Sequence, residues 1–429
     1  MSRIFKIFLH IYFLSLFSIV NGQFTSHSPY SKFGIGDILQ KGFAQNRALG
    51  GIGVGLRAKN RINYLNPASY SSQDTMSFIF DVGLSGNYST LETTETNQIT
   101  RDINVNHIAI SFPIIKVWKS SFGVVPFSKV SYNLISQENS EENLNSYNIL
   151  YNGKGGINQF YFGNSVLIGN HVALGMNISY LFGIIERSKT IRLTDYTYQA
   201  FTNFNDKVNI GDFYLDYGLQ FFSNINEKNK LTLGLTFTNK TNINAEYDSL
   251  AVRDFIPFRA DTFNRANYSK ETILLPRKIG VGLTYELDKK LTIGFDYISE
   301  NWEKALFPGQ GDTLANSSSF RFGLEYTPIP LTTAVRSKYW QRINFRLGGH
   351  YTKSFLLIGG NQLVDYGLSL GLGLPLKSEK KLFTNTSFGI TYEFGQRGTL
   401  DNGLIQETYH LLSIGLTLYD FWFFKPKYD

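Results

Sequence analysis

The sequence predicts an all-β fold, a transmembrane antiparallel β-barrel, on three observations. Apolar or aromatic residues alternate with Gly, Thr, Ser or charged residues in many runs, most clearly in Gly280–Leu287, Leu291–Tyr297 and Val364–Leu374. Successive side chains of a strand point to opposite faces, so each run has one apolar face and one polar face. No segment after the N-terminus approaches the ~20 apolar residues of a transmembrane helix. Aromatic residues make up 15% of the chain and charged residues only 17%, against about 25% charged in soluble proteins.

Residues 1–22 have the organisation of a secretory signal peptide. Arg3 and Lys6 precede an apolar run from Ile7 to Val20, and small or modest side chains stand just before Gln23. The run is too short to span a bilayer comfortably, so a membrane anchor or a buried helix is the less favoured alternative. We expect cleavage before Gln23, export, and a place in the bacterial outer membrane.

Residues 23–72 do not have the pattern of a barrel wall. They are rich in Gly, Ser and Asn and contain only short apolar runs. A connection of this length without secondary structure of its own is either functional or disordered. Its Tyr, Phe, Leu and Ile content argues against disorder. We therefore expect a compact plug, or hatch, inside or beneath the barrel.

Residues 73–429 form the predicted barrel. The candidate strands allow twelve, fourteen or sixteen strands, since bacterial barrels have even strand numbers. The pattern separates Tyr147–Asn152 from Phe160–Ile168, and Tyr196–Phe204 from Asp212–Phe222. Short polar turns, such as Asp288-Lys289-Lys290, alternate with longer polar stretches. We expect these stretches to be external loops; they are Gln137–Ser146, Asp248–Arg265 and Ser299–Ser318.

Six ionisable residues lie on the polar side of their predicted strands: Asp81, Asp296, Glu325, Arg346, Asp365 and Glu393. A cation facing lipid at the membrane midplane costs ~2–4 kcal/mol, and an acid less, so we expect these side chains to face the lumen. They either contact a passing solute or form ion pairs that anchor the plug to the wall. We favour ion pairs, because buried charges are normally paired.

The sequence contains no pattern typical of an active site. Cysteine is absent, the six histidines are isolated, and no His-x-x-x-His pair is present, so we expect no metal, no cofactor and no enzyme activity. His350 is the residue to test for a barrel hydrolase, although a lumen or rim imidazole is the simpler interpretation. Basic residues are scattered, which argues against nucleic acid and favours contact with lipid headgroups.

The N-terminal motifs resemble a known family. Gly50, Gly51, Gly53 and Gly55 belong to a glycine-rich block, and the triplet Asn66-Pro67-Ala68 follows it. This arrangement is similar to the hatch of the long-chain fatty-acid transporter (FadL-like) superfamily. The Ser28–Gly34 opening resembles a Bacteroidota branch that also contains barrels attached to secretion and assembly machines. The resemblance implies a fourteen-stranded barrel and makes these seven residues the expected hatch motif: Gly50, Gly51, Gly53, Gly55, Asn66, Pro67 and Ala68.

Two functions follow from the fold and the resemblance. The resemblance implies a plugged channel for passive uptake of hydrophobic or amphipathic small molecules. The alternative is a non-transporting barrel that is a subunit of an outer-membrane protein assembly or secretion complex. The expected partners are therefore outer-membrane lipid and either a hydrophobic small molecule or other assembly or secretion proteins.

Overall fold

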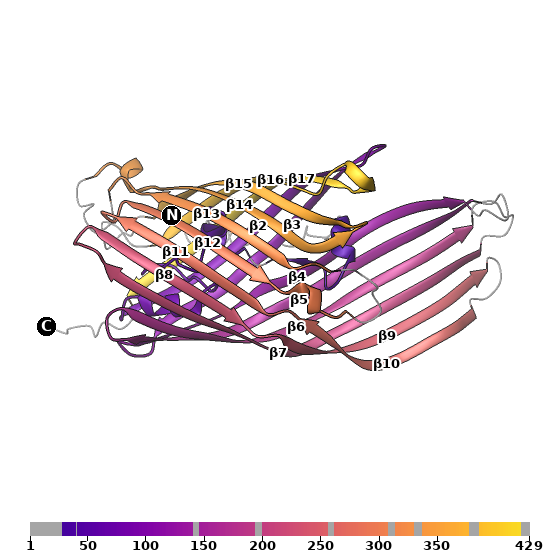
Figure 1. Ribbon diagram of the computed structural model, residues 1–429, viewed down its shortest axis with the longest axis horizontal. Helices are drawn as coiled ribbons and strands as arrows, with labels where there is room; N and C mark the ends of the chain where they lie inside the picture. The colour runs from indigo at the N-terminus through magenta and orange to yellow at the C-terminus, as the bar shows by residue number, and fades with distance from the viewer. Residues whose placement is uncertain are drawn as a thin grey trace, which may run out of the picture.

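The barrel wall is one antiparallel sheet that closes on itself. The computed structural model describes residues 28–39, 41–139, 146–193, 200–255, 261–307, 314–329, 337–376 and 386–421; the predicted signal peptide and its cleavage site lie outside this part. The sheet closes because β17 (Gln406–Phe421) pairs with β2 (Ser77–Glu92) along their whole length (Figure 1). Closure leaves no free edge where these two strands meet.

The wall strands are β2, β3 (Asn97–Pro113), β4 (Trp118–Asn139), β5 (Ser146–Ile168), β6 (Val172–Leu193), β7 (Ala200–Asn224), β8 (Asn229–Thr238), β9 (Thr241–Phe255), β10 (Asp261–Leu275), β11 (Lys278–Leu287), β12 (Leu291–Glu300), β13 (Ser317–Tyr326), β14 (Asn344–Ile358), β15 (Asn361–Pro375), β16 (Ser387–Arg397) and β17. β7 pairs with both β8 and β9, while β11 pairs with β8 and β10 with β9. β8 with β9, and β10 with β11, are thus two halves of single wall strands. The barrel has fourteen strands, which confirms the predicted fold class.

Three sequence-based assignments of strands and loops are wrong. The two strands predicted on either side of residues 153–159 are one strand, β5, which stays paired with β6 through Gly155 and Gly156 despite their positive φ. β7 likewise joins Asp212–Phe222 to the described part of the preceding predicted strand. Asp248–Arg265, expected as a loop, belongs to β9 and β10 on either side of residues 256–260.

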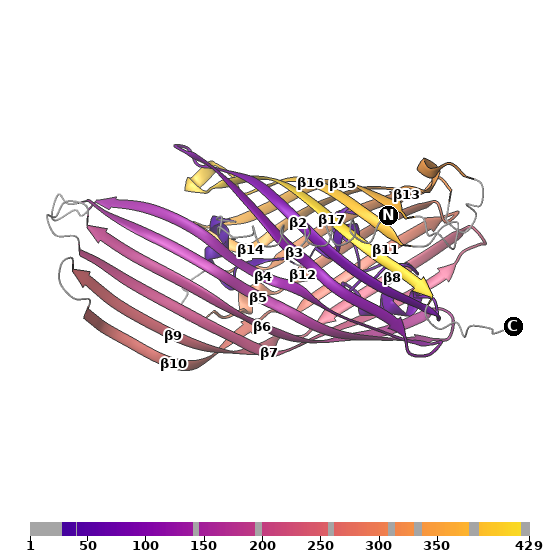
Figure 2. The same ribbon diagram turned by 180° about the vertical axis from the view of Figure 1, so that it is seen from behind.

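These errors have a common cause in the length of the strands. β4, β5, β6, β7, β9 and β10 extend as one sheet well beyond the other strands (Figure 1, Figure 2). β7 has 25 residues, whereas β11, β12 and β13 have ten each. A transmembrane strand needs only ~9–11 residues. In the part outside the membrane the outer face of the sheet meets water and not lipid, so that face needs no regular series of apolar residues.

The outer face of the barrel is apolar and the inner face is polar. Val281 and Leu370 point outward and are 45% and 58% exposed, whereas Thr284 and Ser369 point inward and are buried. Aromatic side chains pair on the outer face, as where the rings of Tyr297 and Phe320 lie 4.9 Å apart. Such a surface suits a lipid environment with aromatic residues at its borders. None of the helices in the described residues is long and apolar enough to cross a membrane.

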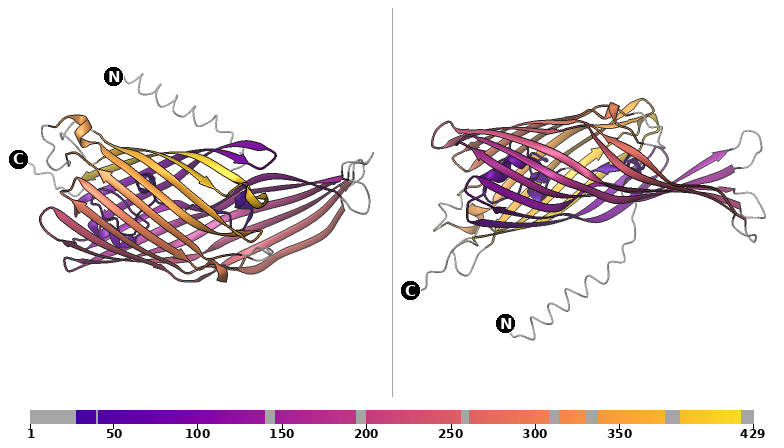
Figure 3. Two further views of the ribbon diagram at one scale, coloured as in Figure 1. Left: turned by 45° about the horizontal axis from the view of Figure 1, so that its top comes forward. Right: turned by 90° about the horizontal axis from the view of Figure 1, so that it is seen from below.

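The chain from residue 28 to residue 76 lies inside the barrel (Figure 3). It contains η1 (Pro29–Lys32), β1 (Asp37–Ile38), α2 (Ala44–Arg47) and η2 (Pro67–Ser72); we call residues 28–76 the N-terminal segment. β1 pairs with β4, and η2 packs against β5, β6 and β7. The apolar side chains of Phe43, Tyr64 and Tyr70 pack against Ile79 and Tyr161 of the wall. The inner face of the barrel is therefore largely covered by its own chain.

Candidate functional site

The glycine block brings the N-terminal segment into backbone contact with the wall. Gly50 has φ +67° and Gly51 has φ +85°, a region that favours glycine. A Cβ atom at Gly50 would lie 2.4 Å from the carbonyl oxygen of Gly349, and one at Gly348 would lie 1.9 Å from the Gly50 nitrogen. The Gly50 N–H donates a hydrogen bond of 3.1 Å to Ser369 Oγ. Only glycines on both sides permit this approach.

Asp296 on β12 binds the second half of the same block. Its Oδ2 accepts hydrogen bonds from the backbone N–H groups of Gly53 (2.6 Å) and Val54 (2.8 Å), and its Oδ1 accepts one from Gly55 (3.4 Å). The Asp296 residue is only 1% exposed. Successive N–H groups that converge on one anion form a nest. Here the anion is a wall carboxylate, so the nest is already occupied.

The Asn66-Pro67-Ala68 triplet holds the start of η2 against β7 and β8. Asn66 Oδ1 accepts the Ala68 N–H (3.1 Å), and Asn66 Nδ2 donates to the Val54 carbonyl at 2.7 Å. The same Nδ2 lies 3.4 Å from the carbonyls of Leu219 and Leu235 in the wall. Pro67 occupies the first turn of η2, where its missing N–H costs nothing.

Glu325 on β13 joins the wall to the segment through two arginines. Arg346 Nε of the neighbouring strand donates to Glu325 Oε2 at 2.6 Å, and Arg61 of the segment pairs with Glu325 Oε1. All three side chains are largely buried. Among the described residues, Arg346 thus connects to the segment through this carboxylate.

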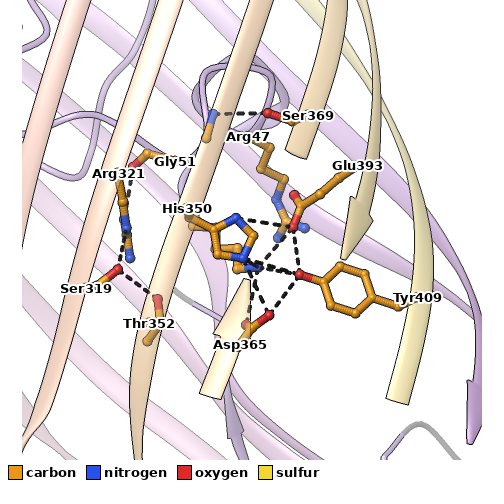
Figure 4. Close-up of polar contacts among 12 residues, drawn as sticks. Arg47, Gly51, Ser319, Arg321, His350, Thr352, Asp365, Ser369, Glu393 and Tyr409 are labelled. Carbon is orange, nitrogen blue, oxygen red and sulfur yellow. Dashed lines mark hydrogen bonds and ion pairs between the residues drawn. The ribbon is translucent and has the colours of Figure 1, made fainter. Parts of the chain in front are cut away.

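Lys41 of the segment enters a second carboxylate cluster. Figure 4 shows the wall residues of this cluster: His350, Asp365, Glu393 and Tyr409. Its Nζ lies 3.0 Å from Glu393 Oε1 and 3.7 Å from Asp365 Oδ2. Tyr409 OH lies within hydrogen-bonding distance of both carboxylates, at 3.2 Å and 3.0 Å. His350 Nε2 lies 3.3 Å from Lys41 Nζ and 3.5 Å from Asp365 Oδ1. His350 is therefore one member of a buried ion-pair cluster.

Asp81 does not touch the segment directly. It accepts hydrogen bonds from His107 Nε2 and Thr417 Oγ1, both at 2.6 Å. Phe43 of the segment stacks flat on the His107 ring, with 3.6 Å between ring centroids. The six ionisable residues thus fall into two groups. Asp296, Glu325, Asp365 and Glu393 contact the segment; Asp81 and Arg346 reach it through a neighbour.

Sequence reasoning missed the partners that the segment itself supplies. Lys41 and Arg61 are two of its charged contacts, and Asn63 Nδ2 donates to the Gly53 and Leu56 carbonyls at 2.7 and 3.1 Å. Arg57 stacks on Phe222 at 3.9 Å, and burial lowers the pKa of its guanidinium to about 10. A search for basic residues between positions 23 and 72 would have identified these cations, but not their partners.

A cavity of about 630 Å³ remains between the N-terminal segment and the strands β2 to β6 and β15 to β17. Four basic and four acidic side chains are among its lining residues: Lys41, Arg47, Lys129, Arg397, Asp37, Asp365, Glu393 and Glu407. Arg397 Nη1 pairs with Asp37 Oδ1 at 2.8 Å. Ligand pockets for apolar compounds are lined mainly by apolar and aromatic side chains. This lining is mixed, because ion-paired charges lie beside apolar side chains such as Ile38, Leu39 and Leu411.

The wall opens beside this cavity. The ladder between β3 and β4 runs only from Pro113↔Lys119 to Ile108↔Val124. Beyond it, Lys129 of β4 contacts Asp102 of β3 and donates to Asn104 Oδ1 at 2.8 Å. Side chains, and not backbone pairing, therefore connect β3 to β4 next to the cavity; we call this gap the β3–β4 seam.

Comparison with known proteins gives a family and a fold. No curated protein matches the sequence. Among solved structures, the CymD monoaromatic hydrocarbon channel has a TM-score of 0.53 and 11% identity, covering 89% of this chain and 98% of that one. The toluene transporter TbuX of Ralstonia pickettii has a TM-score of 0.52 and 12% identity, covering 88% of this chain and 98% of that one. TodX of Pseudomonas putida, also a toluene transporter, has a TM-score of 0.50 and 12% identity, covering 89% of this chain and 98% of that one.

These identities establish a shared fold, the FadL-like barrel, and nothing about the ligand. The match to a family model is more extensive, since the model described as BamG matches residues 3–429. Because that match includes nearly the whole sequence, the chain belongs to the BamG family.

Proposed function

We propose that this protein is a non-transporting barrel subunit of an outer-membrane protein assembly or secretion complex. The observation that carries the proposal is the anchoring of the N-terminal segment by wall carboxylates at three places: the buried Asp296, the buried Glu325, and the Asp365–Glu393 pair, of which Glu393 is buried. Breaking a buried ion pair costs about 3–5 kcal/mol, so a segment held in this way acts as a fixed plug. Membership of the BamG family also favours the assembly alternative.

The proposal includes the division of the chain. Residues 1–22 direct export and are removed, residues 23–72 form the plug, and residues 73–429 form the barrel in the outer membrane. The contacts of Asn66-Pro67-Ala68 with β7 and β8 support the second boundary, because η2 connects directly to β2 after them. The wall holds the plug and presents its outer surface to lipid and to partner proteins.

A plugged channel for hydrophobic or amphipathic molecules is the second candidate. The β3–β4 seam and the cavity beside it favour this function, because a lumen that opens sideways has a route into the membrane. The solved hydrocarbon channels share the fold. Against the candidate stand the eight charged residues of the cavity, since an apolar solute there would have to displace water from charged groups.

A strain that lacks the gene separates the two functions. The subunit function requires normal uptake of radiolabelled toluene and of a long-chain fatty acid, together with a loss of other outer-membrane or secreted proteins in quantitative proteomics. A saturable uptake defect with unchanged outer-membrane composition would eliminate it in favour of the channel. Complementation with the full-length gene controls for effects on neighbouring genes.

A further inference from the structure

The β3–β4 seam leaves one strand edge covered and the other uncovered. On the β4 side, β1 of the N-terminal segment pairs as Asp37↔Lys129 and Ile38↔Ser128, and the Leu39 N–H donates to the Phe127 carbonyl at 3.0 Å. On the β3 side, residues 103–105 pair with residues 84–86 of β2. In the part of the chain that the structure describes, no strand pairs with their other edge.

Exposed apolar side chains lie beside this edge on the outer face of the barrel. Ile103 and Val105 point outward and are 83% and 54% exposed, and Ile103 has the highest exposure of the large apolar side chains in the described residues. Val105 pairs with Leu84, itself 41% exposed on the outer face. An open sheet edge is not tolerated in hydrocarbon, because each unsatisfied backbone group costs several kcal/mol. The edge must therefore be covered by another molecule or by water.

The cavity behind the edge also contains a hydrogen-bond donor and an acceptor without partners among the described residues. Asn106, only 6% exposed, lines the cavity, and its Nδ2 has no hydrogen-bond partner among the described residues. Asn87 also lines the cavity, and its buried Oδ1 has no partner there. One amide thus offers a donor and the other an acceptor. A peptide group offers one acceptor and one donor, and so does every second residue along a strand edge.

We propose that the free edge of β3 at Ile103–Val105 binds an extended segment of another outer-membrane polypeptide, which adds to the barrel as a β-strand. Strand addition uses main-chain hydrogen bonds for affinity and alternate side chains for specificity. β1 already binds the facing edge in this way, so the seam accommodates an extended chain. An alternating segment would place apolar side chains beside Ile103 and polar groups toward Asn87 and Asn106. The inference rests on the proposed function, since it identifies the surface at which the complex forms.

The sequence contains no cysteine, so an introduced cysteine is the single thiol of the chain that a maleimide probe can label. Single-cysteine variants Ile103→Cys and Val105→Cys are labelled in intact outer membranes with benzophenone maleimide and irradiated, and the adducts are mapped by mass spectrometry. The control is Leu283→Cys, which is 42% exposed on β11, a strand that is paired on both edges.

We expect both β3 probes to cross-link to one short segment of one other protein, at positions about two residues apart, and the Leu283 probe not to label that segment. Three results would overturn the proposal: adducts with lipid only, adducts with a second copy of this chain, or adducts scattered over many proteins without a common segment. Native purification separates this from the function. If the complex persists while the β3 probes label only lipid, strand addition at β3 is wrong and the subunit function stands. If the protein purifies without other proteins, both are wrong.

Discussion

Asp296→Ala is the substitution that most directly loosens the N-terminal segment. The carboxylate is buried and accepts three backbone N–H groups from Gly53, Val54 and Gly55. Its removal leaves three buried donors, each at about 1–3 kcal/mol. Water that enters the vacated space recovers part of this cost, so we expect a loss of about 3–5 kcal/mol in the free energy that docks the segment. Asp296→Asn keeps the shape and one acceptor oxygen and should lose less.

The assay is limited proteolysis of the purified protein in detergent, with barrel integrity followed by heat-modified mobility on gels. We expect Asp296→Ala to accelerate cleavage within residues 28–76 by at least about a hundredfold, the factor that 3 kcal/mol represents, while the barrel stays folded. Glu186→Ala is the control, because its pair with Lys154 is 41% and 53% exposed and exposed pairs contribute at most about 1 kcal/mol. Equal cleavage rates for Asp296→Ala and Glu186→Ala would refute the anchoring role of Asp296.

Three further predictions use matched pairs of variants. Lys41→Ala should destabilise the protein by about 3–5 kcal/mol because it leaves the buried Glu393 carboxylate without its cation, while Lys154→Ala should cost at most about 1 kcal/mol; an equal fall in thermal unfolding temperature would contradict this. Gly50→Ala should displace the segment through its 2.4 Å clash with Gly349, whereas Gly169→Ala, at φ +59° with no atom within 4 Å, should show only backbone strain of about 1 kcal/mol; proteolysis of the segment distinguishes them. Val281→Arg, on the lipid face, should make the free energy of insertion into vesicles less favourable by ~2–4 kcal/mol. Thr352→Arg, beside a lumen cavity, should leave it unchanged. Equal insertion of the two variants would mean that the two faces are misassigned.

The sequence predicts the class of the fold well because one physical rule acts along every strand. Lipid outside and polar contacts inside impose a period of two, so Val281 and Thr284 could be placed on opposite faces from their positions alone. The rule ends where the membrane ends. The polar residues of β9 and β10 were therefore expected as a loop, although they continue the sheet in water.

The candidate site is less accessible to sequence reasoning because its contacts are tertiary. The alternation along β12 and β13 predicts that the side chains of Asp296 and Glu325 point inward. The neighbouring sequence does not indicate that Asp296 accepts hydrogen bonds from three N–H groups some 240 positions earlier. The β3–β4 seam is equally hard to foresee. The alternation of β3 shifts by one residue at Asn106 and His107, but nothing in the sequence shows that the neighbour of β3 changes from β4 to no described strand. Pairing between distant segments is decided by the closed barrel as a whole.

The mass of the complex that contains this protein tests the central claim most directly. The full-length protein is purified from the native outer membrane in mild detergent through a C-terminal tag, and its mass and composition are measured by native mass spectrometry. The account predicts a stable assembly in which this chain and other outer-membrane proteins occur in fixed ratio. A barrel that purifies without other proteins, and that takes up toluene or a fatty acid after reconstitution in vesicles, would contradict it.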